Sequence, residues 1–165
     1  MEVGRRATAF GMNVIAYDPL ISDEDIKKRG AEPVALLDGI YAWSDFISLH
    51  LPLTKDTRNL IGREAFSQMK DGVRIVCAAR GGIIDESALV EALSQGKIAA
   101  AVLDVTDPEP LPEDHPFWTT KNLYLTFHTS AMSYPEDISN LFIENYRLYL
   151  EGKPLKYQVD FERGY

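Results

Sequence analysis

The sequence has few of the cysteine and histidine residues that stabilise small domains through disulfides or bound metal ions. Its 165 residues include one cysteine, Cys77, and three histidines. A single cysteine cannot form an intrachain disulfide, and no second Cys or nearby His stands at the spacing of metal ligands. No apolar run approaches the roughly 20 residues of a membrane-spanning helix, and residues 1–10 lack the apolar core of a signal peptide. We therefore expect a cytoplasmic protein with no metal site and no membrane partner.

Clusters of positive charge are also scarce. The chain has 17 Lys and Arg against 25 Asp and Glu, a net charge of −8, and its main basic run is only Lys27-Lys28-Arg29. Proteins that bind DNA or RNA use clustered Lys and Arg to neutralise phosphates, so we expect no nucleic acid partner. With 45% hydrophobic and 25% charged residues, the composition is that of one globular domain large enough to bury a core.

Short apolar segments alternate with helical patterns along the chain. Runs rich in β-forming residues predict buried strands at 12–18, 44–51, 73–78, 98–105 and 122–127. Helices are predicted at 2–10, from Ser22 to Gly30, from Ser87 to Gly96, and from Pro135 to Gly152, where capping residues, Gly and Pro mark the ends. The alternation predicts an α/β fold with a mostly parallel sheet covered by helices on both faces.

Titratable side chains gather where these strands end. Ligands of open α/β sheets bind at the carboxyl ends of the strands, which here are Asp18, His50 to Pro52, Ala78 to Arg80, Asp104 and His128. An acid at Asp18 can accept hydrogen bonds from ribose hydroxyls and repels a 2′-phosphate. The alternative for Asp18 is a purely structural role in the turn before Pro19.

Three of the candidates suit acid–base chemistry and carboxylate binding. The guanidinium of Arg80 can bind a carboxylate through two hydrogen bonds, although a salt bridge on the rim is the alternative. Glu109 lies between two prolines that fix the backbone, and His128 beside a carboxylate can move a proton near neutral pH. His50 and His115 are weaker candidates, since His50 lies inside its strand end and His115 lies in a loop expected to be solvated.

Three segments in order resemble the D-isomer-specific 2-hydroxyacid dehydrogenase family: residues 47–54 (ISLHLPLT) with Thr57, residues 79–86 (ARGGIIDE), and residues 103–105 (LDV) with 109–111 (EPL). The resemblance places the catalytic residues of the family on Arg80, Glu109 and His128. It implies NAD as the cofactor, with Arg80 and His128 touching it as well. The further cofactor-binding positions that it implies are the ribose-binding Asp18, Leu51 and Pro52 beside the adenosine, Ala78 and Ala79 at a strand end, and Asp104 on the nicotinamide amide.

The sequence departs from the family pattern at several points. Cys77 stands where the family usually has Asn, Phe127 where a proline fixes the backbone before the histidine, and residues 129–131 where a Gly-containing turn is usual. Family members also carry a substrate domain, a first nucleotide-binding strand and a G-x-G-x-x-G turn upstream of the point matching Met1. We therefore expect a doubly wound, Rossmann-type sheet that lacks its first strand and Gly-rich turn, marginal stability, and weaker NAD binding than in an intact domain.

The resemblance implies hydride transfer between NAD(H) and a D-2-hydroxy acid or 2-oxo acid, as part of a longer enzyme. The alternative is a catalytically silent dinucleotide-binding or dimerisation module. Residues 1–134 are expected to form an incomplete NAD(P)-binding domain, and residues 135–165 a helix and tail that pack toward a substrate domain. A homodimer is expected, and the identity of the 2-hydroxy acid is left open.

Overall fold

The computed structural model describes residues 2–162 as an α/β fold. In chain order the elements are α1 (Glu2–Ala9), β1 (Ile15–Ala16), α2 (Asp23–Lys28), β2 (Glu32–Pro33), α3 (Leu37–Trp43), β3 (Phe46–Leu49), α4 (Arg63–Gln68), β4 (Val73–Cys77), α5 (Glu86–Ser94), β5 (Ile98–Leu103), the 3-10 helix η1 (Pro116–Trp118), β6 (Leu123–Leu125) and α6 (Pro135–Leu150). Each predicted strand is present but shorter, most of all β1. β2, α3, α4 and η1 were not predicted from the sequence.

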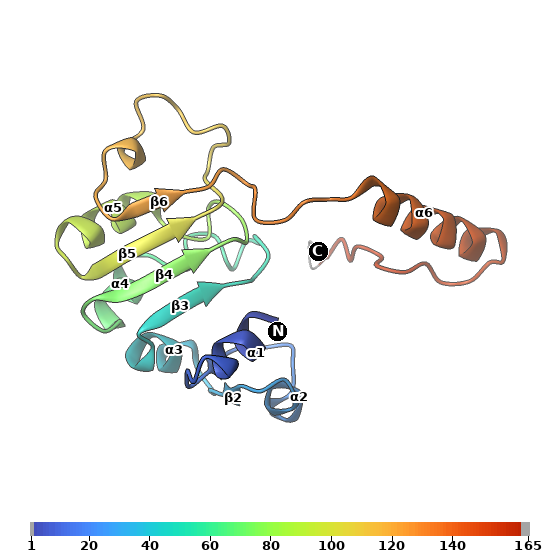
Figure 1. Cartoon of the computed structure of the whole chain (residues 1–165), viewed down its shortest axis with the longest axis horizontal. Helices are drawn as coiled ribbons and strands as arrows, with labels where there is room; N and C mark the ends of the chain where they lie inside the picture. The colour runs from blue at the N-terminus through green and yellow to red at the C-terminus, as the bar shows by residue number, and fades with distance from the viewer. Residues whose placement is uncertain (1, 163–165) are drawn as a thin grey trace.

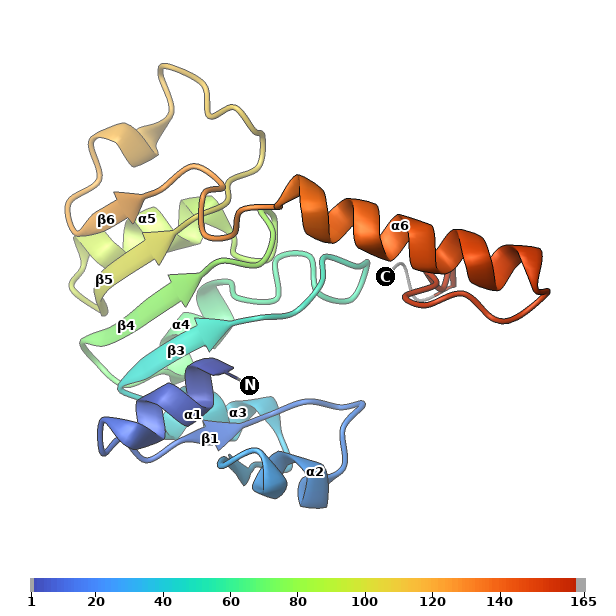
Figure 2. The same cartoon turned by 45° about the vertical axis from the view of Figure 1, so that its right-hand side comes forward.

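The strands form two separate parallel sheets. One has the order β3-β4-β5-β6 and the other pairs β1 with β2. In both views α1 lies between β3 and the β1–β2 pair (Figures 1 and 2). The Thr8 hydroxyl on α1 donates to the Gly30 carbonyl at 3.3 Å, which ties this helix to the smaller sheet. Within the described residues the sheet therefore remains split where the sequence led us to expect a missing strand.

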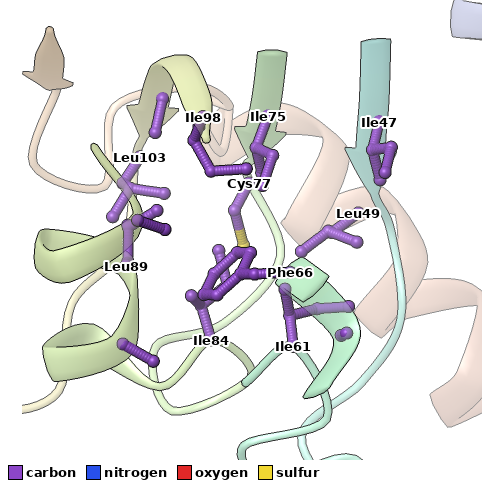
Figure 3. Packing of buried hydrophobic residues seen from close by; sticks show 14 of the residues in the cluster. Ile47, Leu49, Ile61, Phe66, Ile75, Cys77, Ile84, Leu89, Ile98 and Leu103 are labelled. Carbon is purple, nitrogen blue, oxygen red and sulfur yellow. The ribbon is translucent and has the colours of Figure 1, made fainter. Parts of the chain in front are cut away.

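The core lies on one face of the larger sheet, under α4 and α5. Side chains of β4 alternate, so that Val73, Ile75 and Cys77 are buried while Arg74 and Val76 are not. The inward residues pack with those of the two helices and their loops (Figure 3). Each fully buried aliphatic side chain contributes about 1.5–3 kcal/mol to the stability of the fold. This core therefore stabilises the packing of α4 and α5 on the sheet.

The opposite face of the larger sheet is open. Its outward side chains include Phe46, Val76, Val102 and Tyr124, which are all exposed. The prediction that helices cover both faces is therefore wrong for β3–β6 in the described part of the chain. Parallel sheets are normally buried on both faces, because the crossover connections place helices there.

Side-chain caps and glycines mark the ends of two helices. The Ser22 hydroxyl accepts the Asp25 N–H at 3.2 Å at the start of α2, as predicted. Asp85, which was not predicted as a cap, accepts the Ala88 N–H at 3.0 Å at the start of α5, so this helix begins before the predicted Ser87. Gly30 and Gly96 follow these two helices with φ of 83° and 75°, in the left-handed region that favours glycine.

The last helix stands apart from the sheets. α6 begins at Pro135 as predicted and extends away from the body on an extended connection (Figures 1 and 2). Phe142 and Tyr149 on it are 68% and 69% exposed. Residues 163–165 of the predicted tail lie outside the described residues. No helix within residues 2–162 combines the length and apolar character needed to span a membrane.

Candidate active site

A hollow of about 210 Å³ lies beyond the carboxyl ends of β3 to β6. It is lined by residues that follow all four strands: Leu53, Arg58, Arg80, Gly81, Val105, Thr106, Asp107, Glu109 and His128. Arg80 follows β4, Glu109 follows β5 and His128 follows β6. Because parallel strands end at one edge of the sheet, residues far apart in the sequence meet there. The fold thus brings together all three predicted catalytic side chains.

The imidazole of His128 is paired with the carboxylate of Glu109. His128 Nδ1 lies 2.9 Å from Glu109 Oε2, and Glu109 Oε1 accepts the Thr106 N–H at 3.1 Å. The hydrogen bonds from His128 and Thr106 hold the pKa of Glu109 below its usual value, although partial burial opposes them. Glu109 is therefore a carboxylate at neutral pH, and it orients the ring so that Nε2 is left for another partner.

A buried carboxylate holds the turn that carries His128. Asp104 is 4% exposed, and its Oδ1 accepts the Thr126 hydroxyl at 2.6 Å and the Thr129 N–H at 2.8 Å. Its Oδ2 accepts the Ser130 N–H at 3.0 Å, and the His128 N–H donates to its backbone carbonyl. Burial raises the pKa of this carboxyl, but these hydrogen bonds outweigh burial and hold the pKa well below the ordinary value.

The turn has a left-handed backbone at two successive residues. Phe127 has φ of 53° and His128 has φ of 59°, a region that non-glycine residues rarely adopt. The Phe127 ring stacks on Trp118 with centroids 5.4 Å apart. The position where the family usually has proline is thus held by ring stacking and by the Asp104 carboxylate.

Arg80 projects from the loop after β4 without an acidic partner. Its Nη1 donates to the neighbouring Ala79 carbonyl at 2.7 Å, and no ion pair to Arg80 is found within residues 2–162. The alternative of a salt bridge on the rim is therefore not seen in the described structure. The exposed guanidinium retains N–H groups that can bind an anion.

The other predicted cofactor positions do not line the hollow. Asp18 follows β1 on the smaller sheet, where its Oδ1 accepts the Leu20 N–H at 2.9 Å, so it does form the turn considered as its alternative role. Leu51 and Ala79 pack partly buried against the core, and the Pro52 carbonyl accepts the Thr57 hydroxyl at 2.7 Å. Ala78 is exposed and Asp104 is occupied as described above.

The two weaker histidine candidates have protein partners. His115 was expected in a solvated loop, and this is wrong: its side chain is 20% exposed, and Nε2 lies 3.2 Å from Glu86 Oε2. Burial raises the pKa of Glu86, despite the hydrogen bond that it accepts from the Asp107 N–H. His50 Nε2 lies 2.8 Å from the Ser48 hydroxyl, and burial lowers its pKa.

Six residues that line the hollow were not predicted as site residues from the sequence: Leu53, Arg58, Gly81, Val105, Thr106 and Asp107. Arg58 and Asp107 form an ion pair at 2.9 Å although they are 49 positions apart in the sequence. No short-range pattern signals such a pair; only the proximity of Thr106 and Asp107 to Glu109 marked their loop. Within the described chain no cluster of three or more His, Cys, Asp or Glu side chains is suited to a metal ion.

Comparison with known proteins places the fold and the motifs in one family. The family model described as D-isomer specific 2-hydroxyacid dehydrogenase, NAD binding domain, matches residues 1–130. The chain belongs to this family. The resemblance drawn from its sequence motifs is thereby confirmed, as is its Rossmann-type fold class.

Curated relatives from several organisms share this segment. The chain is 50% identical over 130 residues to D-3-phosphoglycerate dehydrogenase of Methanocaldococcus jannaschii, a match that covers 79% of this chain and 25% of that protein. It is 52% identical over 109 residues to hydroxypyruvate reductase of Thermotoga maritima, covering 66% of this chain and 34% of that protein. The chain thus spans about a quarter to a third of the length of these relatives.

Solved structures resemble the whole described chain. A D-isomer specific 2-hydroxyacid dehydrogenase from Xanthobacter autotrophicus Py2, in complex with NADPH and MES, superposes with a TM-score of 0.90 at 32% identity, covering 98% of this chain and 66% of that one. The NADPH-dependent glyoxylate/hydroxypyruvate reductase of Sinorhizobium meliloti, in complex with NADP and sulfate, gives 0.90 at 29% identity, covering 99% and 53%.

Proposed function

We propose that this chain supplies the cofactor-binding side and the catalytic Arg, Glu and His of a dehydrogenase that interconverts D-2-hydroxy acids and 2-oxo acids with NAD(H). The observation that carries the proposal is the convergence of Arg80, Glu109 and His128 on one hollow at the carboxyl edge of the sheet. Relatives named D-3-phosphoglycerate dehydrogenase and hydroxypyruvate reductase support this reaction class.

The His128–Glu109 pair would move the proton of the reaction. A bound nicotinamide cofactor supplies or accepts the hydride. His128 Nε2 donates a proton to the oxygen of the 2-oxo group as that oxygen gains charge, and takes the proton back in the oxidation direction. Glu109, 2.9 Å from Nδ1, stabilises the imidazolium and keeps the ring in one orientation.

Arg80 would hold the substrate. Its exposed guanidinium can bind the substrate carboxylate with two parallel hydrogen bonds and point a further N–H at the reacting oxygen. Binding of this kind places the carbonyl carbon at a fixed distance from His128. All 2-oxo acids have a carboxylate beside the reacting carbon. Arg80 would therefore select for 2-oxo acids as a class, but not for the side chain of a particular acid.

The chemistry of the donor set fits the two ends of a dinucleotide. Arg80 and His128 line the hollow at the carboxyl edge of the larger sheet, and the exposed carboxylate of Asp18 follows β1 of the smaller sheet, where its Oδ2 makes no hydrogen bond within the described residues. We propose that Asp18 binds the adenosine ribose and favours NAD over NADP by repelling the 2′-phosphate. Leu51, Pro52, Ala78, Ala79 and Asp104 would border the cofactor between these ends.

Two measurements test the function. Calorimetric titration of the purified chain with NADH and with NADPH should give saturable binding that is tighter for NADH, and Asp18→Ser should reduce that preference. Equal affinity for both cofactors in the unchanged chain would refute the role of Asp18.

Catalysis is tested in a graft in which residues 1–130 replace the matching segment of the M. jannaschii enzyme. His128→Ala should lower kcat by about a thousandfold and leave the Kd for NADH within about twofold, since a general acid typically contributes 10²–10⁴. Equal losses in both would mean that His128 is structural. If the chain binds NADH but every graft is inactive, the alternative of a catalytically silent binding module is favoured.

We also propose the organisation of the chain and its assembly. Residues 1–134 would form the cofactor-binding unit, and the following helix and tail would pack on a substrate domain through the exposed side chains of α6. Self-association into a homodimer would cover apolar surface, and sedimentation analysis would show a mass twice that of the chain.

We further propose a cytoplasmic location, which agrees with the buried free thiol of Cys77. Cell fractionation would test it.

A further inference from the structure

An ion pair lies directly over the turn that follows the substrate-binding arginine. Arg58 Nη1 and Asp107 Oδ2 are 2.9 Å apart. A Cβ added at Gly82 would lie 2.9 Å from each of these two atoms. The pair thus bridges the loop after β3 and the loop after β5, and in doing so it closes over the loop after β4, which carries Arg80.

Backbone hydrogen bonds fix both ends of this bridge. On the Arg58 side, the Asn59 N–H donates to the Gly82 carbonyl at 2.8 Å, so the backbone next to Arg58 is held against the glycine turn. On the other side, the Asp107 N–H donates to Glu86 Oε1 at 3.0 Å, at the first residue of α5. The backbone next to each charged side chain is therefore held in place by a hydrogen bond to another loop or helix.

The bridge also joins the two halves of the chemistry. Asp107 follows Thr106, whose N–H binds Glu109, and Glu109 holds His128. Arg58 is linked through Asn59 to the turn that follows Arg80. The relative placement of the carboxylate-binding group and the proton-transfer pair therefore depends on three loops, and the Arg58–Asp107 contact is the side-chain link between the two outer ones.

We propose that Arg58 and Asp107 are positioning residues that clamp these three loops and set the placement of Glu109–His128 relative to Arg80. The proposal rests on the proposed function for the meaning of that placement. The two side chains are 53% and 47% exposed, so the pair adds little to overall stability. Its effect is expected on geometry, because a displacement of about 1 Å can cost a hundredfold in rate.

The first test measures the pKa of the Glu109 carboxyl by NMR in the full chain, without cofactor or substrate. Removing the negative charge of Asp107 by Asp107→Asn would, by Coulomb's law alone, lower this pKa further. A loosened loop would instead weaken the hydrogen bonds from His128 and Thr106 that hold the pKa down, and would raise it. We expect the pKa of Glu109 to rise; an unchanged or lower value overturns the clamp.

Matched variants separate the clamp from a general charge effect. Asp45 forms an exposed ion pair with Lys70 at 2.9 Å in a different part of the chain, so Asp45→Asn should leave the pKa of Glu109 unchanged. The double exchange Arg58→Asp with Asp107→Arg should bring the pKa back toward the unaltered value. Should Asp107→Asn fail to fold, Asp107→Ser removes the same charge and gives the same comparison.

The second test measures kinetics in the graft described above. Asp107→Asn and Arg58→Ala should each lower kcat about tenfold, with the KM for NADH within about twofold, and the double exchange should recover most of the loss. A rate that does not change in either variant overturns the proposal. If the graft is inactive while the NMR shift is seen, the clamp stands and the proposed function fails.

Discussion

Replacing Gly81 with alanine tests how closely the loop after β4, which carries Arg80, packs on the loop after β5, which carries Glu109. A Cβ at this position would lie 2.0 Å from the Thr106 carbonyl oxygen, 2.3 Å from its carbon and 2.9 Å from the Asp107 nitrogen. All three are backbone atoms, which cannot swing aside as the end of a flexible side chain does. The loop after β4 must therefore move away from the loop after β5, or the new methyl group cannot be accommodated.

The cost follows from the size of this overlap. Forcing one extra methyl group into a packed site typically costs about 1–3 kcal/mol, and a clash with backbone belongs at the upper end, near 3 kcal/mol. For a chain of this size that corresponds to a melting temperature lower by roughly 6–12 °C. Circular dichroism melts and urea titrations of Gly81→Ala measure the loss directly.

Gly62→Ala is the matched control, because it adds the same methyl group to a neighbouring loop. There the new Cβ would be 3.4 Å from the Asn59 carbonyl oxygen and 3.9 Å from Asp85 Cβ, which is close to ordinary contact. Its stability should change by less than about 1 kcal/mol. If Gly81→Ala melts like the control, the two loops are not in contact, and the reasoning about how Arg80 and Glu109 are placed fails with it.

Three further changes probe the same structure. Asp104→Asn should cost about 2–3 kcal/mol at neutral pH because an amide nitrogen would face backbone N–H donors; since the pKa of Asp104 is depressed, the difference from the unaltered chain in urea titrations should shrink as the pH falls below 3.8. Burial, followed by the charge of a nearby acid, raises the pKa of Tyr41 to about 12 from 10.0, so stability should fall as the pH rises through this interval, and Tyr41→Phe should remove that loss. Phe127→Pro should lower the melting temperature, because proline cannot adopt φ of 53° and also removes the stacking on Trp118, whereas Phe127→Asn should lose only the stacking; a more stable proline variant would contradict the left-handed turn.

Local chemistry explains the parts of the fold that could be predicted. Helix starts at Ser22 and Pro135 depend on the capping group or fixed φ of one residue, and each is confirmed. The five strand positions follow from short apolar runs, which are visible without any tertiary information. β2 and α4 were missed because β2 is only two residues long and the six residues of α4 have no side-chain cap.

The open face of the larger sheet shows where local patterns mislead. The apolar run at 73–78 was interpreted as a strand buried on both sides, yet Arg74 and Val76 point away from the core. An apolar side chain can be buried, but whether it is buried depends on whether another helix or strand packs against it. For β3–β6 the described helices α4 and α5 cover only one face, and the outward row from Phe46 to Tyr124 is left exposed.

The candidate site divides along the same physical line. Arg80 and His128 were predicted because each follows a strand, and parallel strands end at one edge of the sheet. Glu109 was predicted from the two prolines around it, and the family resemblance pointed to all three residues. Arg58 and Asp107 were not found, because their meeting depends on how three loops fold over Gly82 rather than on where any strand ends. Where loops pack backbone against backbone, the sequence shows only a glycine at the point of contact. Glycine also occurs for many other reasons, so it does not by itself indicate such a contact. The side chains proposed to perform chemistry are thus predictable from strand ends and family motifs, while those proposed to hold them in place require the packed structure.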